Sequence, residues 1–179
     1  LGRPYVDFAG SGVVHMVRGW AALAGSIVLG PRLGKFNKDG SANAIPGHNL
    51  NMAVIGAFIL AFGWFGFNPG STLGASGSGN LRIGEIAVVT MLAGAAGSVT
   101  AMAYAKATLG KYDPGYMVNG LLAGLVAITA PSGYVSPALA VLIGAIAGPL
   151  VCISMAFVET KLKVDDPVGA FAVHGVCGA

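Results

Sequence analysis

Two short segments, one near each end of the chain, repeat a pattern of residues that could handle protons. Asp7 is followed by a Val-His pair that ends at His15, and Asp166 is followed by a Val-His pair that ends at His174. The interval from Asp to His is eight residues in both segments. Imidazole can donate and accept protons near neutral pH, so a matched pair could relay protons or hydrogen-bond a small polar substrate.

A structural role and a metal site are the alternatives for these histidines. A lone histidine in apolar sequence most often bonds a backbone carbonyl across a helix interface, but two in matched positions favour a functional pair. Two imidazoles are too few ligands for a metal ion, although Cys177 lies one helical turn from His174. We therefore expect no metal and no cofactor.

The other reactive side chains indicate no catalysis. His48 follows Pro46-Gly47 in a predicted loop, where a capping or interfacial role fits. Cys152 and Cys177 lie in apolar runs without the spacing of a metal or redox motif, so we interpret both as core-facing or lipid-facing residues. The sequence contains no HExxH motif and no phosphate-binding loop. We expect a protein that is not an enzyme.

The composition indicates the environment that surrounds these residues. Hydrophobic residues make up 55% of the chain and charged residues 9%, whereas soluble domains carry about 25% charged residues. The 29 glycines suit helices that pack closely in lipid. The net charge of +3 is spread through predicted loops, so we expect no nucleic-acid partner. These features predict a multi-pass protein of the cell membrane, with the lipid bilayer as its main partner.

Apolar runs of about 20 residues are needed to cross the roughly 30 Å hydrocarbon layer of a membrane. Five segments meet that length, and they are residues 7–30, 48–70, 84–108, 115–131 and 135–158, of which the fourth is the shortest. A sixth begins at Asp166 and reaches only about 21 Å before the chain stops at Ala179. We predict an all-α polytopic membrane helix bundle over residues 1–179, in a chain that is part of a longer protein.

Basic residues divide the predicted loops into two sets. The loops after the first, third and fifth spans hold seven of them, namely Arg32, Lys35, Lys38, Lys106, Lys111, Lys161 and Lys163, and the intervening loops hold only Arg82. The positive-inside rule places the first set in the cytoplasm. The first and sixth spans then run in opposite directions, which brings the two histidines to similar depth. This arrangement predicts an inverted repeat with its site at the midplane.

Three blocks of sequence occur in order along the chain. The first is Asp-Phe-Ala-Gly-Ser at residues 7–11, followed by Val-His at 14–15 and Gly-Pro-Arg at 30–32. The second is Gly-Trp-Phe-Gly-Phe-Asn-Pro-Gly-Ser at 63–71, and the third is Val-Asp-Asp-Pro at 164–167 with Val-His-Gly at 173–175. Together they resemble the ammonium transporter (Amt/Mep/Rh) family, the Amt branch in particular, and the resemblance covers essentially the whole chain.

The resemblance implies a fold and an assembly. The family fold has eleven membrane helices in two inverted halves and forms a homotrimer with one pore in each subunit. This chain would hold the fifth helix through the start of the tenth. The family's second gating phenylalanine and its vestibule tryptophan would lie on helices outside the chain. A cytoplasmic regulatory protein is a further partner that the resemblance implies.

The resemblance also assigns roles to individual residues. His15 and His174 match the family's twin histidines, whose rings share a hydrogen bond along the pore. The outer phenylalanine gate falls on Phe67, a hydroxyl that helps to receive ammonium falls on Ser71, and a pore-lining tryptophan falls on Trp64. Asp7 matches an acidic residue needed for the structure around the outer mouth, and Asp166 takes the equivalent place in the second repeat.

These roles imply a mechanism and leave alternatives. We expect ammonium to lose its proton near Phe67, ammonia to pass His15 and His174, and the proton to return by the imidazole pair or an associated water path. A pure gas channel without net charge movement is the alternative within the family. A membrane sensor that reports ammonium occupancy to a signalling partner is the alternative of a different class.

Arg18 departs from the family pattern, which usually has a small residue at this position. It lies three positions after His15, where a charge inside the bilayer costs about 2.5–3.5 kcal/mol. The side chain could extend to the inner interface, pair with an acidic group elsewhere in the protein, or place a positive charge near the pore that weakens cation passage.

Overall fold

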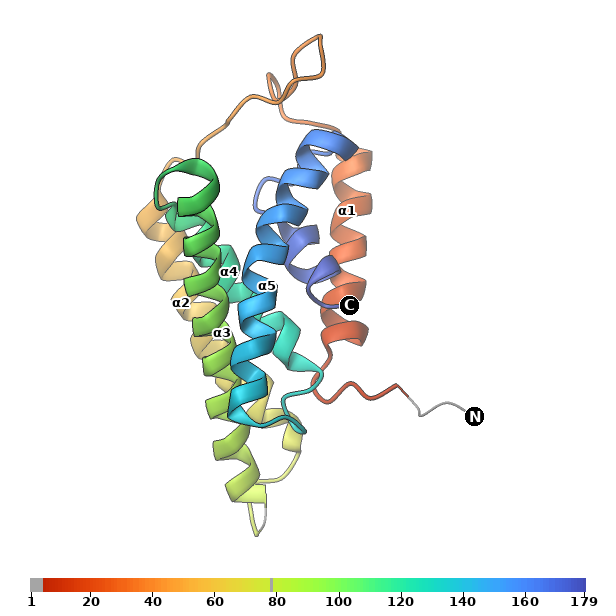
Figure 1. Ribbon diagram of the computed structural model, residues 1–179. Coiled ribbons are helices and arrows are strands. Elements are labelled where there is room, and N and C mark those ends of the chain that lie inside the picture. Colours follow the sequence, from red (N-terminus) through yellow and green to blue (C-terminus); the bar gives the residue numbers. More distant parts are fainter. Residues whose placement is uncertain (1–4, 78) are drawn as a thin grey trace.

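The computed structural model describes residues 5–77 and 79–179 as a bundle of helices (Figure 1). A π-helical turn, η1 (Ser11–Met16), leads into α1 (Val17–Leu29), and α2 (Leu50–Phe67) ends in the 3-10 turn Pro69–Thr72. The long helix α3 (Gly79–Leu109) is followed by α4 (Pro114–Thr129) and α5 (Pro137–Phe157). Helix α5 continues in the turn Val158–Leu162, and the last helical segment is η4 (Phe171–Val176).

Helices α3, α4 and α5 form the tightly packed centre of the bundle, and small residues allow the contact. A Cβ atom added at Gly124 or Gly144 would meet the carbonyl oxygen of Ala93, and one added at Gly148 would meet the hydroxyl of Thr100. The backbones therefore touch, as expected for helices that gain little from hydrophobic contact in lipid. Around these contacts the side chains of Leu125, Val126 and Val151 are fully buried.

Helix α1 and η4 lie side by side at one edge of the bundle (Figure 1). A Cβ atom at Gly19 would collide with the backbone of Gly175, so the two segments also meet backbone to backbone. The turn η1, which leads into α1, carries His15, and η4 carries His174, the two histidines of the predicted inverted repeat. Their contact brings the two ends of the chain together.

Four helical stretches in the described residues are long and apolar enough to cross a membrane, and they are Ser11–Leu29, Leu50–Thr72, Arg82–Leu109 and Pro137–Leu162. The helix predicted at residues 115–131 is present as α4, but it is shorter than these four stretches. Helix α4 has 16 residues and reaches about 24 Å. It starts at Pro114, where Asp113 caps the first amides, and the chain turns after Thr129 at Pro131.

The predicted helix starts at residue 7 and at Asp166 are also displaced. Helical structure begins at Ser11 in the first segment and at Ala170 in the second. The physical reason is the same in both, because a carboxylate can accept hydrogen bonds from free amides only if its own residue lies before the helix.

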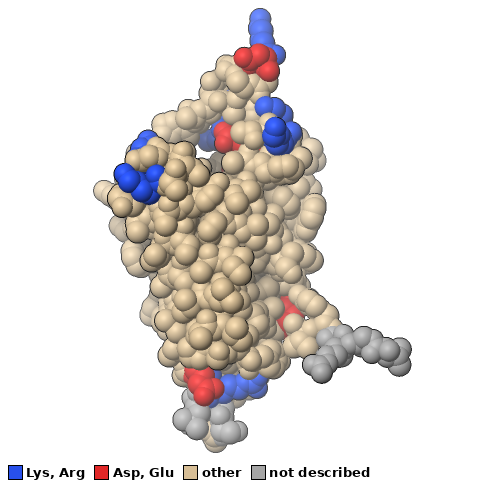
Figure 2. Space-filling view, viewed as in Figure 1, with Lys and Arg blue, Asp and Glu red and all other residues tan. Residues whose placement is uncertain are grey.

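Charged residues gather at the two ends of the bundle, and the middle of the face drawn in Figure 2 carries almost none. The seven basic residues lie in the segments after α1 and α5, in the last turn of α3 and just after α3, and these parts are at the same end of the bundle (Figure 1). Large apolar side chains such as Phe58, Phe62 and Ile146 point outward between the two ends. This belt suits contact with lipid or with further helices of a membrane protein.

The glycine contacts predict a stability difference. In the full-length protein, Gly144→Ala is expected to lower the free energy of unfolding by about 1–3 kcal/mol, because the methyl group has no room beside Ala93. Gly63→Ala is the control, since an added Cβ there meets no atom within 4 Å. Thermal unfolding in detergent, followed by intrinsic tryptophan fluorescence, compares the variants. Equal midpoints would contradict the packing argument.

Candidate functional site

The two histidines of the repeated pattern meet inside the bundle. Nδ1 of His15 lies 3.2 Å from Nδ1 of His174. The rings are nearly parallel, with centroids 5.2 Å apart and planes inclined by 11°. One Nδ1 must donate and the other accept, because two protonated nitrogens cannot share this hydrogen bond. His15 is buried at 4% exposure, and His174 is half-buried.

Asp7 holds the helix that carries His15. Its carboxylate accepts from four consecutive backbone amides at 2.8–3.0 Å, those of Gly10, Ser11, Gly12 and Val13. Gly10 has a φ of 107°, a conformation that glycine adopts readily, and this lets the chain turn into the helix. The carboxylate thus accepts hydrogen bonds from the free amides at the start of η1. Its negative charge also interacts favourably with the positive end of the helix dipole.

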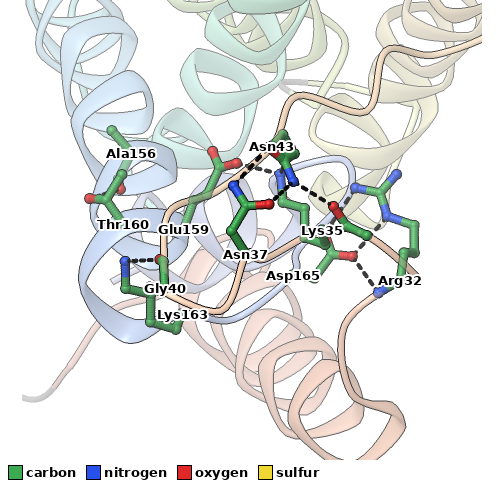
Figure 3. A network of polar contacts seen from close by, with 11 residues as sticks. Arg32, Lys35, Asn37, Gly40, Asn43, Ala156, Glu159, Thr160, Lys163 and Asp165 are labelled. Atoms are coloured by element: carbon green, nitrogen blue, oxygen red, sulfur yellow. Dashed lines mark hydrogen bonds and ion pairs between the residues drawn. The ribbon is translucent and has the colours of Figure 1, made fainter.

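Asp166 has the equivalent position before the segment that carries His174. Its two carboxylate oxygens accept from the amides of Ala170 and Phe171, each at 2.8 Å. The neighbouring Asp165 is buried and binds Arg32 through the backbone amide at 2.9 Å and the guanidinium at 2.8 and 2.9 Å (Figure 3). These hydrogen bonds hold the pKa of the Asp165 carboxyl below its usual value.

The loop after α1 is fixed to the end of α5 by a polar network (Figure 3). Lys35 is buried, pairs with Glu159 and donates to the carbonyl oxygen of Asn43 at 3.1 Å. Lys163 donates to the carbonyl oxygen of Gly40 at 2.6 Å. Together with the Arg32–Asp165 pair, these contacts place the segment before His174 against the segment after α1.

A serine ties the start of the His15 helix to α4. The Ser11 hydroxyl donates to the carbonyl oxygen of Val126 at 2.7 Å and accepts from the amide of Ala130 at 2.6 Å. The amides of Phe8 and Ala9 donate to the carbonyl oxygens of Ala130 and Thr129. The bend before η1 is therefore anchored at the point where α4 ends.

Two aromatic residues of α2 cover the other side of His15. The ring of Trp64 stacks on His15 with centroids 5.3 Å apart and planes 12° apart, and the ring of Phe67 lies 5.3 Å from the same imidazole. Trp64 is buried and donates through Nε1 to the Thr129 hydroxyl at 3.1 Å, whereas Phe67 is 37% exposed. The predicted gate and pore residues are thus neighbours of one histidine.

Ser71 lies beyond Phe67 in the turn that ends α2. Its hydroxyl donates to the carbonyl oxygen of Phe67 at 2.8 Å. The donated proton leaves the oxygen lone pairs of this half-buried side chain available as acceptors. The structure therefore places Ser71 one turn from the ring of Phe67 with an acceptor to offer.

His15 Nε2 is buried without a hydrogen-bond partner in the described part of the chain. It is on the opposite side of the ring from the nitrogen that faces His174. A buried polar atom without a partner is costly, so the position favours a small polar molecule beside it. Asn68 Oδ1 is a second such atom, and Asn68 Nδ2 donates to the Thr90 hydroxyl at 3.2 Å. Asn68 is not among the predicted site residues, because its only signal in the sequence is an amide within an apolar block.

A cavity of about 690 Å³ lies on the far side of His174. Residues of α1, α2, α4 and the segment 167–174 line it. It extends from His174 past Leu60 and Ala57 to Leu50, at the end of the bundle where the basic loops lie. Along α2 the order is therefore Phe67 and Trp64, then the histidine pair, then the cavity.

No three His, Cys, Asp or Glu side chains come together as a metal site in residues 5–77 and 79–179. Both cysteines are buried in the core, where Cys152 Sγ lies 3.2 Å from the carbonyl oxygen of Gly148. His48 lies in the exposed segment before α2 and takes no part in the histidine pair.

Comparison with known proteins gives a consistent result. The sequence matches the Ammonium Transporter Family model over residues 2–179. It is 56% identical over 180 residues to ammonium transporter Amt2 of Archaeoglobus fulgidus. This alignment covers 99% of this chain and 38% of that protein. Ammonium transporter Amt1 of Haloferax mediterranei is 46% identical, with 100% and 36% covered.

Solved structures agree with the sequence matches. The "Sensor Amt Protein" superimposes with a TM-score of 0.93 at 48% identity and covers 97% of this chain and 42% of that one. The crystal structure of Candida albicans Mep2 superimposes with a TM-score of 0.85 at 35% identity, and the match covers 97% of this chain and 37% of that one. The chain thus spans less than half the length of these relatives.

Removal of the Asp7 carboxylate should destabilise the helix that carries His15. Asp7→Ala leaves four amides without their acceptor, and we expect a loss of about 2 kcal/mol or more in the free energy of unfolding of the full-length protein. Asp39→Ala is the control, because Asp39 caps only the exposed loop at Ser41. Thermal unfolding distinguishes the two, and an equal loss in both variants would refute the prediction.

The Arg32–Asp165 pair predicts a dependence of stability on pH. The folded-state pKa of Asp165 is lowered by its hydrogen bond from Arg32. The pair therefore contributes its full stability above the ordinary carboxyl pKa of 3.8, and this contribution disappears as the pH falls further. The difference in unfolding midpoint between the wild type and Asp165→Asn should be largest at pH 5–7 and shrink below about pH 4. A constant difference would contradict it.

Proposed function

The chain belongs to the ammonium transporter family, and we propose that the protein containing it moves ammonium nitrogen across the membrane through a pore lined by Phe67, Trp64, His15 and His174. The observation that carries this proposal is the 3.2 Å contact between the two imidazoles, with aromatic rings on one side and a cavity on the other. The aromatic rings, the histidine pair and the cavity follow one another along α2. They outline a mostly apolar path in which the imidazoles offer hydrogen bonds to a small molecule.

The Phe67 end is the proposed outer mouth. A bare cation that enters an apolar passage meets a cost of tens of kcal/mol. An aromatic face returns roughly 0.5–2 kcal/mol by cation–π contact, and the oxygen of Ser71 accepts a hydrogen bond from ammonium. Potassium ions can contact the ring but cannot donate a hydrogen bond. The remaining cost favours loss of a proton at Phe67, so that neutral ammonia continues.

The histidine pair suits ammonia because it offers both a donor and an acceptor. If His15 Nδ1 carries the shared proton, His15 Nε2 is an acceptor and His174 Nε2 a donor, and the reverse holds if His174 Nδ1 carries it. Ammonia has one lone pair and three N–H groups, so it can hydrogen-bond in both arrangements. His15 Nε2 is buried without a partner among the described residues, and the His15 ring lies 5.3 Å from the ring of Phe67, so His15 is the histidine of the pair that would receive a molecule from the Phe67 side.

The proton released at Phe67 has two routes. It can return to the outer solution, which makes net transport neutral, or it can follow the imidazole pair or a water path, which produces a current. In both routes one ammonium ion gives one ammonia molecule and one proton. The histidine pair alone is compatible with either, because imidazole donates and accepts.

The position of the chain in the whole protein is part of the proposal. The chain would form the fifth helix through the start of the tenth in an eleven-helix subunit of inverted halves, assembled as a homotrimer. The end with seven basic residues would face the cytoplasm, where a regulatory protein could bind. The exposed apolar faces of α1, α2 and α5 would contact lipid, other helices of the subunit or neighbouring subunits.

A sensor is the second candidate function, and the similarity to the "Sensor Amt Protein" at 48% identity favours it specifically. In a sensor, occupancy of the outer mouth would be reported to a signalling partner, and flux through the histidine pair would not be required. Measured flux therefore separates the two functions.

Substitution of the histidines tests the transport function. In proteoliposomes that contain the full-length protein, His15→Ala with His174→Ala should reduce the uptake of labelled ammonium at least about tenfold, because the passage loses its polar groups. His48→Ala is the matched control, since this third histidine is exposed and remote from the pair. Uptake equal to that of protein-free vesicles in the wild type would reject transport and leave the sensor. Uptake unchanged by the double substitution would reject the histidine pore.

A further inference from the structure

Arg18 stands in the cavity next to the histidine pair. It follows His15 by three residues, so both side chains lie on adjacent faces of the same helix. The Arg18 side chain is exposed and lines the 690 Å³ cavity together with His174. Arg18 therefore lies on the cavity side of the pair, whereas Phe67 and Trp64 contact His15.

The rest of the cavity wall provides no charge to balance Arg18. Among the described lining residues, Asn119 and His174 are polar and Arg18 alone is charged, while the others are apolar or glycine. The amide of Asn119 is directed to Met155 Sδ at 3.2 Å. The cavity thus combines a low-dielectric wall with one fixed positive charge, which strengthens the field inside it.

The acidic residues of the chain are engaged elsewhere. Six of them bind partners in the described structure, and these are Asp7, Asp39, Asp113, Glu159, Asp165 and Asp166. The seventh, Glu85, lies near the start of α3, at the end opposite to the basic loops. None forms an ion pair with Arg18 among residues 5–77 and 79–179.

A guanidinium keeps its charge at any pH that a cell reaches. A cation that leaves the histidine pair toward the basic-loop end must pass this charge in an apolar cavity, where repulsion is poorly screened. Neutral ammonia meets no such repulsion. Fixed arginine charges exclude protons and cations from other narrow pores by the same physics.

We propose that Arg18 acts as a charge filter, which lets neutral ammonia pass from the histidine pair into the cavity and excludes ammonium and excess protons. The inference rests on the proposed transport function and refines it, because it selects the neutral route. The proton released from ammonium at the Phe67 end then returns to the solution on that side. Transport carries little net charge, and Arg18 is a residue that determines specificity.

The experiment compares charge movement with flux in proteoliposomes that contain the full-length protein. Ammonium-evoked current is recorded on a solid-supported membrane, and ammonia entry is followed as a rise in internal pH above that of protein-free vesicles. Arg18→Gln removes the charge while keeping a long polar side chain, and Arg18→Lys keeps the charge. We expect the wild type and Arg18→Lys to show the pH rise with little current, and Arg18→Gln to show at least about tenfold more current.

The outcomes separate the filter from the transport function. Equal current per unit flux in the wild type and Arg18→Gln overturns the filter and leaves transport intact. Flux and current in Arg18→Gln, with neither in the wild type, overturn the filter, because Arg18 would then block ammonia as well, and they also reject transport by the natural protein. Absence of flux in all three proteins overturns both. A current in Arg18→Lys as large as in Arg18→Gln also overturns the filter, because charge would then not be its cause.

Discussion

A hydrogen bond between two imidazoles, 159 residues apart in the chain, is the interaction on which the other features depend. It requires two helical segments that start from opposite ends of the bundle and place their histidines at the same depth. Carboxylates at Asp7 and Asp166 fix where each segment starts. The contact of Gly19 with Gly175 fixes how closely they approach. The pair is therefore set by backbone geometry more than by the side chains around it.

The surroundings of this pair differ on its two sides. Trp64 and Phe67 cover one side with aromatic faces that attract cations, whereas Arg18 places a cation on the other. Apart from Arg18, His174 and Asn119, the residues that line the cavity are apolar or glycine, so a charge costs more there than a neutral molecule. Polar atoms without internal partners occur where a substrate would need them, as at His15 Nε2.

The sequence was sufficient to predict the membrane bundle and the meeting of the two histidines, because long apolar runs and an equal interval of eight residues are direct signals. The ends of elements were harder to predict. The pattern predicts helix starts at Asp7 and Asp166, whereas both carboxylates cap the helix from a position before it, and the span predicted at residues 115–131 is a helix of 16 residues. The hydrogen bond from the Ser11 hydroxyl to α4 has no signal in the sequence, since a serine in an apolar run has the same appearance whether or not its hydroxyl bonds another helix.

Asp165 and Asp166 are adjacent, yet they bind different parts of the molecule. Asp165 holds Arg32 in the loop that leaves α1, and Asp166 caps the helix of His174. One peptide unit therefore joins the loop contact to the cap of the helical segment that carries His174. Displacement of Arg32 would free the residue directly before this cap and so affect the position of His174, although no residue of the loop contacts the histidine pair in the described structure.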